Sequence, residues 1–167
     1  MSPPSEGEPR TDPAALQIVP LPDDPAVIET IAAWHQAAWG HLTGRSREER
    51  ARELARQCGS EAIPLTLMAA SAGRPVGAAS LLTHDMDTHP EWSPWLASVY
   101  VAPTHRRQGI GEQLCRAIVA EAKRLGVPRL FLFTPDKAAF YARQGWREIA
   151  REPYRGEDVT VMEQVLP

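Results

Sequence analysis

The chain has 167 residues, which suits one domain with a hydrophobic core of its own. It contains 43% hydrophobic and 23% charged residues, as soluble globular proteins do, and its formal net charge of -3 gives no reason to expect nucleic-acid binding. The two cysteines form neither a disulfide framework nor a zinc motif. No apolar run approaches the ~20 residues of a membrane span, and the first residues lack the apolar region of a signal peptide, so we expect a cytoplasmic protein without a membrane partner.

The first residues of the chain differ in composition from the rest. Residues 1–14 are rich in Pro, Ser, Glu and Asp and show no apolar period, which predicts a flexible N-terminal tail. Residues 15–167 are expected to form a single domain.

Apolar periodicity, capping residues and turn residues divide this domain into strands and helices. Asp24-Pro25 and Ser46-Arg47-Glu48-Glu49 are typical helix starts, and the first helix is expected to end at Gly40. The expected helices cover residues 25–40, 46–59, 109–125 and 136–144. The expected strands cover residues 15–21, 65–70, 75–83, 95–101, 129–133, 147–152 and 159–165, with a loop at 84–94.

These elements follow the order β-α-α-β-β-β-α-β-α-β-β. The strand-helix-strand unit around residue 110 requires one pair of parallel strands inside a sheet that is otherwise mostly antiparallel. Residues 129–133 are almost continuously apolar, which predicts a central, buried strand. The predicted fold class is therefore α/β in the wide sense (α+β), with a mixed sheet.

The most informative segment runs from Val99 to Glu112. It combines a β-branched strand, a short basic turn and Gly109-Ile110-Gly111 at the start of an amphipathic helix. The two glycines let the backbone curl so that several amide N–H groups point at one spot, and the helix adds its unpaired N–H groups and the positive end of its dipole. With the charges of Arg106 and Arg107, this turn predicts a diphosphate site. A P-loop would need Gly-Lys-Ser/Thr, and a Rossmann motif would need a third glycine at position 114, which is Leu.

Two motifs in this sequence resemble a known family. Arg106-x-x-Gly109-x-Gly111, preceded by Val101-x-Pro103, resembles the coenzyme A signature of the GCN5-related N-acetyltransferases (GNAT). The segment Ala139-Phe140-Tyr141-Ala142-Arg143-Gln144-Gly145-Trp146 resembles the late helix and glycine turn of the same family. The motifs come in the family's order, and the resemblance is strongest over residues 95–150.

The resemblance implies a GNAT-like fold, acetyl-CoA as cosubstrate and direct attack of a primary amine on the thioester. It implies that Tyr141 is catalytic and protonates the departing thiolate, and that a backbone N–H of the strand holds the thioester oxygen. The cofactor-binding residues that it implies are Val99, Tyr100, Val101, Arg106, Arg107, Gln108, Gly109, Ile110, Gly111, Glu112 and Thr134.

The general base is less clearly indicated. The strand 95–101 has no carboxylate, and Ser98 is its only small polar residue. The candidates therefore lie in the loop that precedes it, and a chain of ordered water is an equal alternative. These candidates are His84, Asp85, Asp87, His89 and Glu91. No metal is expected, because the chemistry requires none and a polar loop is ordinarily solvated.

The acceptor is expected to be a primary amine of a small molecule or peptide. Acidic residues beside the site would favour a cationic amine, so the acceptor-site candidates are Asp85, Asp87 and Glu91. Aromatic side chains could also bind a cationic amine through cation–π contacts, although core packing is the preferred interpretation for each individual tryptophan. These residues are Trp34, His35, Trp39, Trp92 and Trp95.

Two alternatives to an N-acetyltransferase stay open at this point. One is a non-catalytic acyl-CoA-binding module of the same fold. The other is a nucleotide or phosphosugar binder that uses the same anion site. The sequence also leaves a homodimer open.

Overall fold

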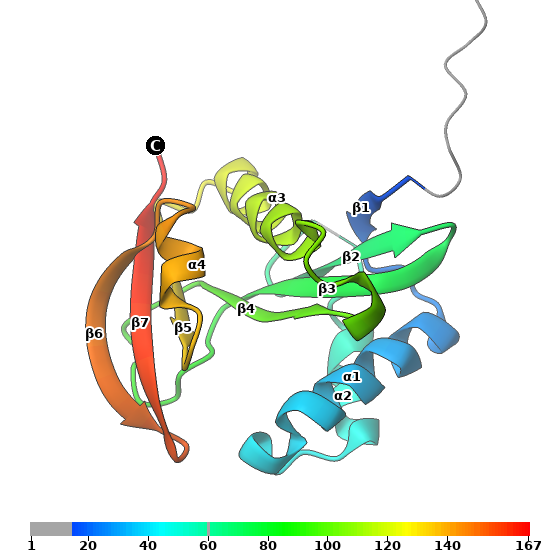
Figure 1. The fold of residues 1–167 in the computed structure, drawn as a ribbon, viewed down its shortest axis with the longest axis horizontal. Coiled ribbons are helices and arrows are strands. Elements are labelled where there is room, and N and C mark those ends of the chain that lie inside the picture. The colour runs from blue at the N-terminus through cyan, green and yellow to red at the C-terminus, as the bar shows by residue number, and fades with distance from the viewer. Residues whose placement is uncertain (1–14, 60) are drawn as a thin grey trace, which may run out of the picture.

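The computed structural model describes residues 15–59 and 61–167, so the tail predicted at 1–14 lies outside the described residues. A seven-stranded sheet runs through the molecule and carries helices on both faces (Figure 1). The strands are β1 (Gln17–Pro20), β2 (Leu65–Ser71), β3 (Arg74–Leu82), β4 (Trp95–Val101), β5 (Arg129–Thr134), β6 (Arg147–Tyr154) and β7 (Glu157–Val165). The helices are α1 (Pro25–Thr43), α2 (Arg47–Ala55), α3 (Ile110–Arg124) and α4 (Ala138–Ala142), with a 3-10 turn η1 at Pro103–His105.

The sheet has the strand order β1-β2-β3-β4-β5-β7-β6. Neighbouring strands are antiparallel except for β4 and β5, which are parallel and are connected through α3. The order of the elements and the single parallel pair confirm the predicted fold class.

The parallel strands β4 and β5 are joined at one end only. Their register contains one pair, Trp95 with Phe131, and beside it the Phe131 amide donates to the Pro94 carbonyl (3.0 Å). Beyond this pair the two strands diverge (Figure 1). From Ala97 to Val101, the edge of β4 that faces β5 therefore has no partner strand for its backbone polar groups.

The other edge of β4 contains a β-bulge. Ser98 and Val99 of β4 stand opposite the single residue Ala79 of β3, and Ser98 has a φ of 54°. A bulge bends its strand and redirects the side chains beside it. Ser98, at this bulge, forms part of a pocket wall.

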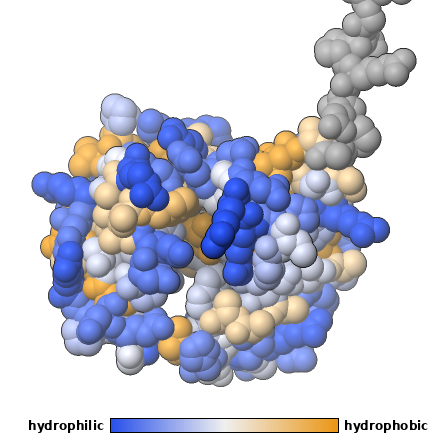
Figure 2. Space-filling model, viewed as in Figure 1, coloured by the Kyte–Doolittle hydropathy of each residue, from blue (hydrophilic) through white to orange (hydrophobic). Residues whose placement is uncertain are grey.

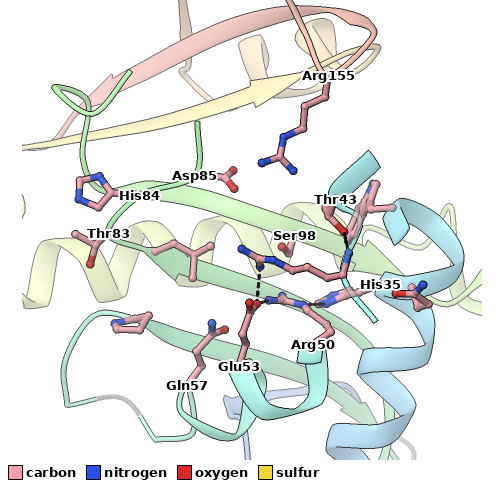
Figure 3. A pocket seen from close by; sticks show the side chains of 15 residues that line it. His35, Thr43, Arg50, Glu53, Gln57, Thr83, His84, Asp85, Ser98 and Arg155 are labelled. Carbon is pink, nitrogen blue, oxygen red and sulfur yellow. Dashed lines mark hydrogen bonds and ion pairs between the residues drawn. The ribbon is translucent and has the colours of Figure 1, made fainter. Parts of the chain in front are cut away.

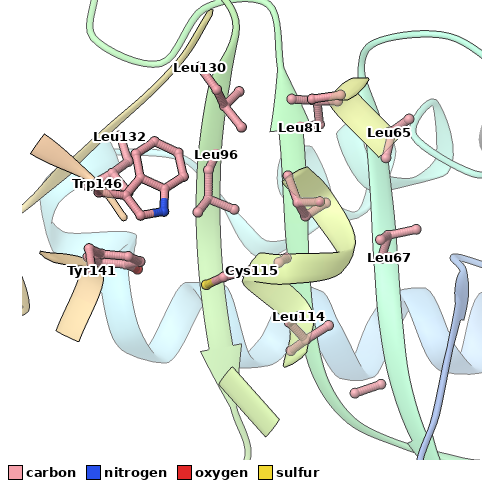
Figure 4. Packing of buried hydrophobic residues seen from close by; sticks show 14 of the residues in the cluster. Leu65, Leu67, Leu81, Leu96, Leu114, Cys115, Leu130, Leu132, Tyr141 and Trp146 are labelled. Atoms are coloured by element: carbon pink, nitrogen blue, oxygen red, sulfur yellow. The ribbon is translucent and has the colours of Figure 1, made fainter. Parts of the chain in front are cut away.

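Different helices cover the two faces of the sheet. Leu114, Cys115 and Ile118 of α3 are fully buried against β2 to β5, as Figure 4 shows for the first two of these residues. The helices α1 and α2 cover the opposite face of β3, where Ile31 and Leu54 are also fully buried. Cys115 is thus a small residue of the core.

The capping residues confirm the predicted helix starts but not every helix end. The Asp24 side chain accepts a hydrogen bond from the Ala26 amide (3.0 Å), and the Ser46 hydroxyl accepts one from the Glu49 amide (3.1 Å). The predicted end of α1 at Gly40 is wrong, because the helix continues to Thr43 and stops where Gly44 adopts a φ of 68°. A glycine inside a helix costs ~1 kcal/mol, which the packing of α1 against the sheet offsets. α2 ends at Ala55, earlier than predicted.

The molecular surface in Figure 2 is mostly hydrophilic, with scattered apolar patches, and is hollowed between the part formed by β5 to β7 and the part formed by α1 and α2. Within the described ranges, no helix combines the length and the apolar character that crossing a membrane requires.

Candidate active site

The turn that is predicted to bind a diphosphate lies between η1 and α3. Arg107 and Gly109 both have positive φ angles, 64° and 78°, so the backbone is sharply curled just before the helix begins. Gly109 is the N-cap of α3, and no side chain caps the helix. The first N–H groups of α3 and the positive end of its dipole are therefore available to an anion beside the turn.

The two arginines of the turn have different surroundings. Arg106 Nε donates to the Val101 carbonyl (2.9 Å), and the Arg106 guanidinium lies 5.4 Å from the centre of the Tyr100 ring. Arg106 therefore fastens the turn to the end of β4. Arg107 is exposed beside the start of α3.

The two motifs that resemble the GNAT family meet in the fold. A Cβ atom on Gly111 would lie 3.7 Å from Phe140 and 3.8 Å from Val101. The helix α4, which carries Tyr141, therefore packs beside the start of α3 and the end of β4.

Tyr141 is almost completely buried in the main core. Its ring makes an edge contact with Trp146 at a centroid distance of 6.3 Å. Figure 4 shows both rings in the same core cluster as Cys115. Burial is the main cause that raises the pKa of Tyr141 above its ordinary value, with smaller contributions from Cys115 and Asp136. The hydroxyl is therefore protonated at neutral pH, which is the state that a general acid requires.

Thr134 has a local role at the start of α4. Its hydroxyl accepts hydrogen bonds from the Lys137 amide (2.9 Å) and the Asp136 amide (3.4 Å). Its side chain thus holds the turn between β5 and α4. A contact of Thr134 with the cofactor stays a prediction.

A pocket of about 360 Å³ lies on the α1–α2 side of the sheet, beside the bulge of β4 (Figure 3). Its lining residues come from α1, α2, the loop after β3 and the turn between β6 and β7. Ser98 of the bulge completes one wall, so the pocket reaches the strand whose far edge faces β5. This volume is in the range of sites for small molecules, ~300–1,000 Å³.

Asp85 is the one predicted acceptor-site carboxylate that lines this pocket. Figure 3 shows its side chain directed into the pocket, toward the guanidinium of Arg155. Burial raises the pKa of Asp85 from 3.8 to about 7, although the positive charges of Arg50, Arg155 and Arg45 act in the opposite direction. A carboxylate with a pKa near neutrality is well suited to accept a proton at physiological pH.

Arg50 forms the floor of the pocket and is only 9% exposed. Its Nε donates to Nδ1 of His35 (2.9 Å), and its Nη1 donates to Oε2 of Glu53 (2.9 Å). The same Glu53 oxygen accepts a hydrogen bond from Nη1 of Arg45 (2.7 Å). Burial and the charge of Arg50 lower the pKa of His35 to about 3, so His35 is neutral and carries its proton on Nε2.

His84, a candidate base, also lines the pocket, whereas Asp87 and His89 fasten the loop at 84–94 to the β6–β7 hairpin. The Tyr154 hydroxyl donates to Asp87 (3.2 Å), and His89 lies between Glu91 (2.8 Å) and Glu152 (2.6 Å). The side chains of Asp87 and Glu91 are 73% and 57% exposed and do not line the pocket. These contacts position the loop, and with it Asp85.

The aromatic residues divide between the core and the pocket. Trp95 is fully buried, Trp92 stacks on His89 at a centroid distance of 4.1 Å, and Trp34 stacks on Tyr100 at 5.4 Å. Of the five aromatic candidates, Trp39 and His35 line the pocket. Among the residues that the structure describes, no group of three His, Cys, Asp or Glu side chains is arranged to hold a metal ion.

Three charged residues of the pocket were not predicted from the sequence: Arg50, Glu53 and Arg155. One signal was available for Arg50, because it stands four residues before Leu54 and therefore shares the buried face of α2. A charged residue on the buried face of a helix requires a partner or a function. Arg155 gave no such signal, because it lies in a turn.

Residues 28–146 match the sequence profile of the acetyltransferase (GNAT) family. The chain belongs to the GNAT family. The match begins in α1 and ends just after α4, so it includes both the glycine turn and Tyr141. The family recognised from the two motifs is confirmed. Among curated proteins, no sequence match was found.

Solved structures of GNAT proteins share the fold of this chain. The yncA protein of Salmonella typhimurium, solved with its cofactor acetyl-CoA, is 20% identical with a TM-score of 0.72, and the alignment covers 92% of this chain and 95% of that one. Aminoglycoside 6'-acetyltransferase type Ii is 17% identical with a TM-score of 0.73, covering 90% of this chain and 98% of that one. N-acetylglutamate synthase from Neisseria gonorrhoeae, complexed with coenzyme A and N-acetyl-glutamate, is 21% identical with a TM-score of 0.66, covering 92% of this chain but 36% of that one. Membership of an acetyltransferase family supports acetyl-CoA as the cosubstrate.

Proposed function

We propose that this GNAT protein is an acetyl-CoA-dependent N-acetyltransferase whose acceptor, a primary amine of a small molecule or peptide, binds in the pocket beside the β4 bulge. The observation that carries this proposal is that Asp85, with a pKa of about 7, lines the same pocket as Ser98 of β4. In this proposal, a group that accepts protons and the strand that binds the thioester lie at one site.

The cofactor is bound by backbone groups in this proposal. The N–H groups of the turn at 106–112 and the exposed Arg107 hold the diphosphate. The pantetheine arm lies along the unpaired edge of β4 and pairs with it as an additional strand would. A backbone N–H between Val99 and Val101 donates to the thioester oxygen, on which negative charge develops.

The reaction is a direct transfer of the acetyl group. Asp85 accepts a proton from the ammonium form of the acceptor, and the free amine attacks the thioester carbon to form a C–N bond. The nitrogen of the tetrahedral intermediate loses its second proton to water, the intermediate collapses and the C–S bond breaks. Tyr141 donates a proton to the departing thiolate and is reprotonated from solvent. The products are the N-acetylated acceptor and coenzyme A.

The test is acetyl transfer from acetyl-CoA to a panel of primary amines, measured by the release of the free coenzyme A thiol. For an acceptor found in this way, we expect Asp85→Asn to lower kcat/KM by ~10²–10⁴-fold, as the loss of a general base does. Asp158→Asn changes an exposed aspartate of β7 outside the pocket and serves as the matched control with unchanged kcat/KM. A larger loss in Asp87→Asn or Glu91→Gln than in Asp85→Asn would overturn the role of Asp85.

Binding measurements separate the alternatives. Calorimetry with acetyl-CoA and with ATP should show binding of acetyl-CoA only. Binding of acetyl-CoA without acetyl transfer to any amine would make the chain an acyl-CoA-binding module. Binding of ATP without binding of coenzyme A would make it a nucleotide binder.

A further inference from the structure

The floor of the pocket contains buried hydrogen-bond donors without acceptors. Nη2 of Arg50 and Nε2 of His35 are both buried, and neither has a hydrogen-bond partner among the described residues. Both residues line the pocket and are buried, with exposed fractions of 9% and 4%. Leaving such donors unpaired is costly, and the cost is larger for a charged group. Both atoms lie just below the surface of the pocket, so the protein only partly neutralises the positive charge of Arg50 at its floor.

The charges that line the pocket favour the same kind of ligand. Three guanidinium groups, those of Arg45, Arg50 and Arg155, line it with two carboxylates, Glu53 and Asp85. A single oxygen of Glu53 accepts the hydrogen bonds of both Arg45 and Arg50. Arg155 approaches Asp87 only to 3.8 Å, which is beyond hydrogen-bond distance. The pocket therefore has more positive than negative charge, and two of its three arginines already share the carboxylate of Glu53.

Two separate groups of charged side chains lie on opposite sides of the pocket, and each group contains a guanidinium and a carboxylate. Figure 3 shows Arg50 between His35 and Glu53 on the floor, with Asp85 and Arg155 on the opposite side and Ser98 behind them. A ligand that bridges the pocket can therefore present one end to Arg50 and Arg45 and the other end to Asp85.

We infer that the acceptor is an aminocarboxylate, in which the positive charges of Arg50 and Arg45 at the floor of the pocket hold a carboxylate while the amine lies beside Asp85 and Ser98. This inference rests on the proposed function, because it names the substrate class of that same pocket. Arg50 binds the substrate and holds one end of it, and Asp85 handles the proton at the other end. The pocket volume of about 360 Å³ suits a single amino acid or a molecule of similar size.

The experiment compares acceptors that differ only in the anionic group. Each amino acid of a small panel is assayed beside its carboxamide, its decarboxylated amine and its aminophosphonate analogue, with the wild-type protein and saturating acetyl-CoA. We expect the carboxamide and the amine to have a kcat/KM at least ~10-fold lower than the amino acid, as the loss of a charge-assisted hydrogen bond implies. The aminophosphonate arm shows whether the site recognises a planar carboxylate or any anion. Carboxamides that react as well as the amino acids would overturn the inference and leave the proposed function standing.

Variants of the pocket provide the second test. Arg50→Gln should raise KM for the amino acid and leave KM for the decarboxylated amine nearly unchanged. Because Arg50 is buried and its loss could disturb α2, the half-exposed Arg45→Gln is measured beside it and should show the same selective effect at smaller size. Calorimetry of amino acid binding to the coenzyme A complex gives a readout without turnover. Equal affinity for the amino acid and its carboxamide there would contradict the inference, whereas preference for the amino acid without acetyl transfer would contradict the proposed function alone.

Discussion

Replacing Asp85 with asparagine should make the protein more stable and less active. The pKa of Asp85 is about 7 in the folded protein against an ordinary value of 3.8, and burial is the main cause. The pKa of Asp85 is higher in the folded than in the unfolded protein, so folding favours the protonated form. The free energy of unfolding therefore decreases as the pH rises from about 3.8 through about 7. Asparagine has a similar shape and never ionises, so it avoids this loss.

The size of the effect follows from the two pKa values. The difference between 3.8 and about 7 corresponds to ~4 kcal/mol of unfolding free energy at a pH above both values. Asp85 is half-buried at the edge of an open pocket, so solvent screens part of this energy and we expect ~1–3 kcal/mol. For a chain of this length, this corresponds to a rise in Tm of ~2–10 °C.

The assay is thermal unfolding of wild type and Asp85→Asn between pH 4 and pH 9. The difference in Tm should be small at pH 4, grow toward pH 7 and stay constant above pH 8. The control variant Asp158→Asn changes an exposed aspartate and should show no such growth. If Asp85→Asn lowers Tm at pH 8, attraction to the three arginines outweighs desolvation, and the basis for Asp85 as a general base is lost.

Three further predictions concern the cofactor site. Arg107→Ala should weaken acetyl-CoA binding about tenfold or more, because a charge-assisted contact contributes ~1.5–3 kcal/mol, and unchanged affinity in calorimetry would refute this. Gly109→Val should weaken binding further, because Gly109 has a φ of 78° that a β-branched residue adopts only with strain. Tyr141→Phe should lower kcat by roughly 10–100-fold with little change in acetyl-CoA affinity or Tm, since only the hydroxyl is removed. Full turnover of Tyr141→Phe under conditions where chemistry limits the rate would leave Tyr141 as a packing residue.

The fold was predictable because its signals are local. The Asp24 and Ser46 caps, the apolar run at 129–133 and the glycine turn each specify their own segment, and the order of segments then restricts the topology. The parallel pair followed from one connection, in which α3 joins β4 to β5. The end of α1 was missed because packing against the sheet outweighs the low helix propensity of Gly40.

The pocket was less predictable because its parts are brought together only by tertiary structure. The sequence indicated three acidic candidates in one loop, and nothing local distinguished Asp85 from Asp87. The distinction arises from the hairpin, where Tyr154 binds Asp87 and leaves Asp85 to face the pocket. The contact between His35 and Arg50 depends in the same way on how α1 packs against α2.

The two ends of the pocket are coupled through electrostatics, which gives a last prediction. Arg50, Arg155 and Arg45 lower the pKa of Asp85, His35 on the floor is neutral, and Glu53 already neutralises part of the positive charge. A carboxylate bound at Arg50 would neutralise more of it, so the pKa of Asp85 should rise when an aminocarboxylate binds and make Asp85 a stronger base at the moment of proton transfer. The pH profile of kcat/KM reports the free protein and that of kcat reports the complex. With an amino acid as acceptor, the acidic limb of kcat should therefore lie at higher pH than that of kcat/KM. With the matching decarboxylated amine, this displacement should disappear, and an equal displacement for both acceptors would show that the arginines do not sense the carboxylate.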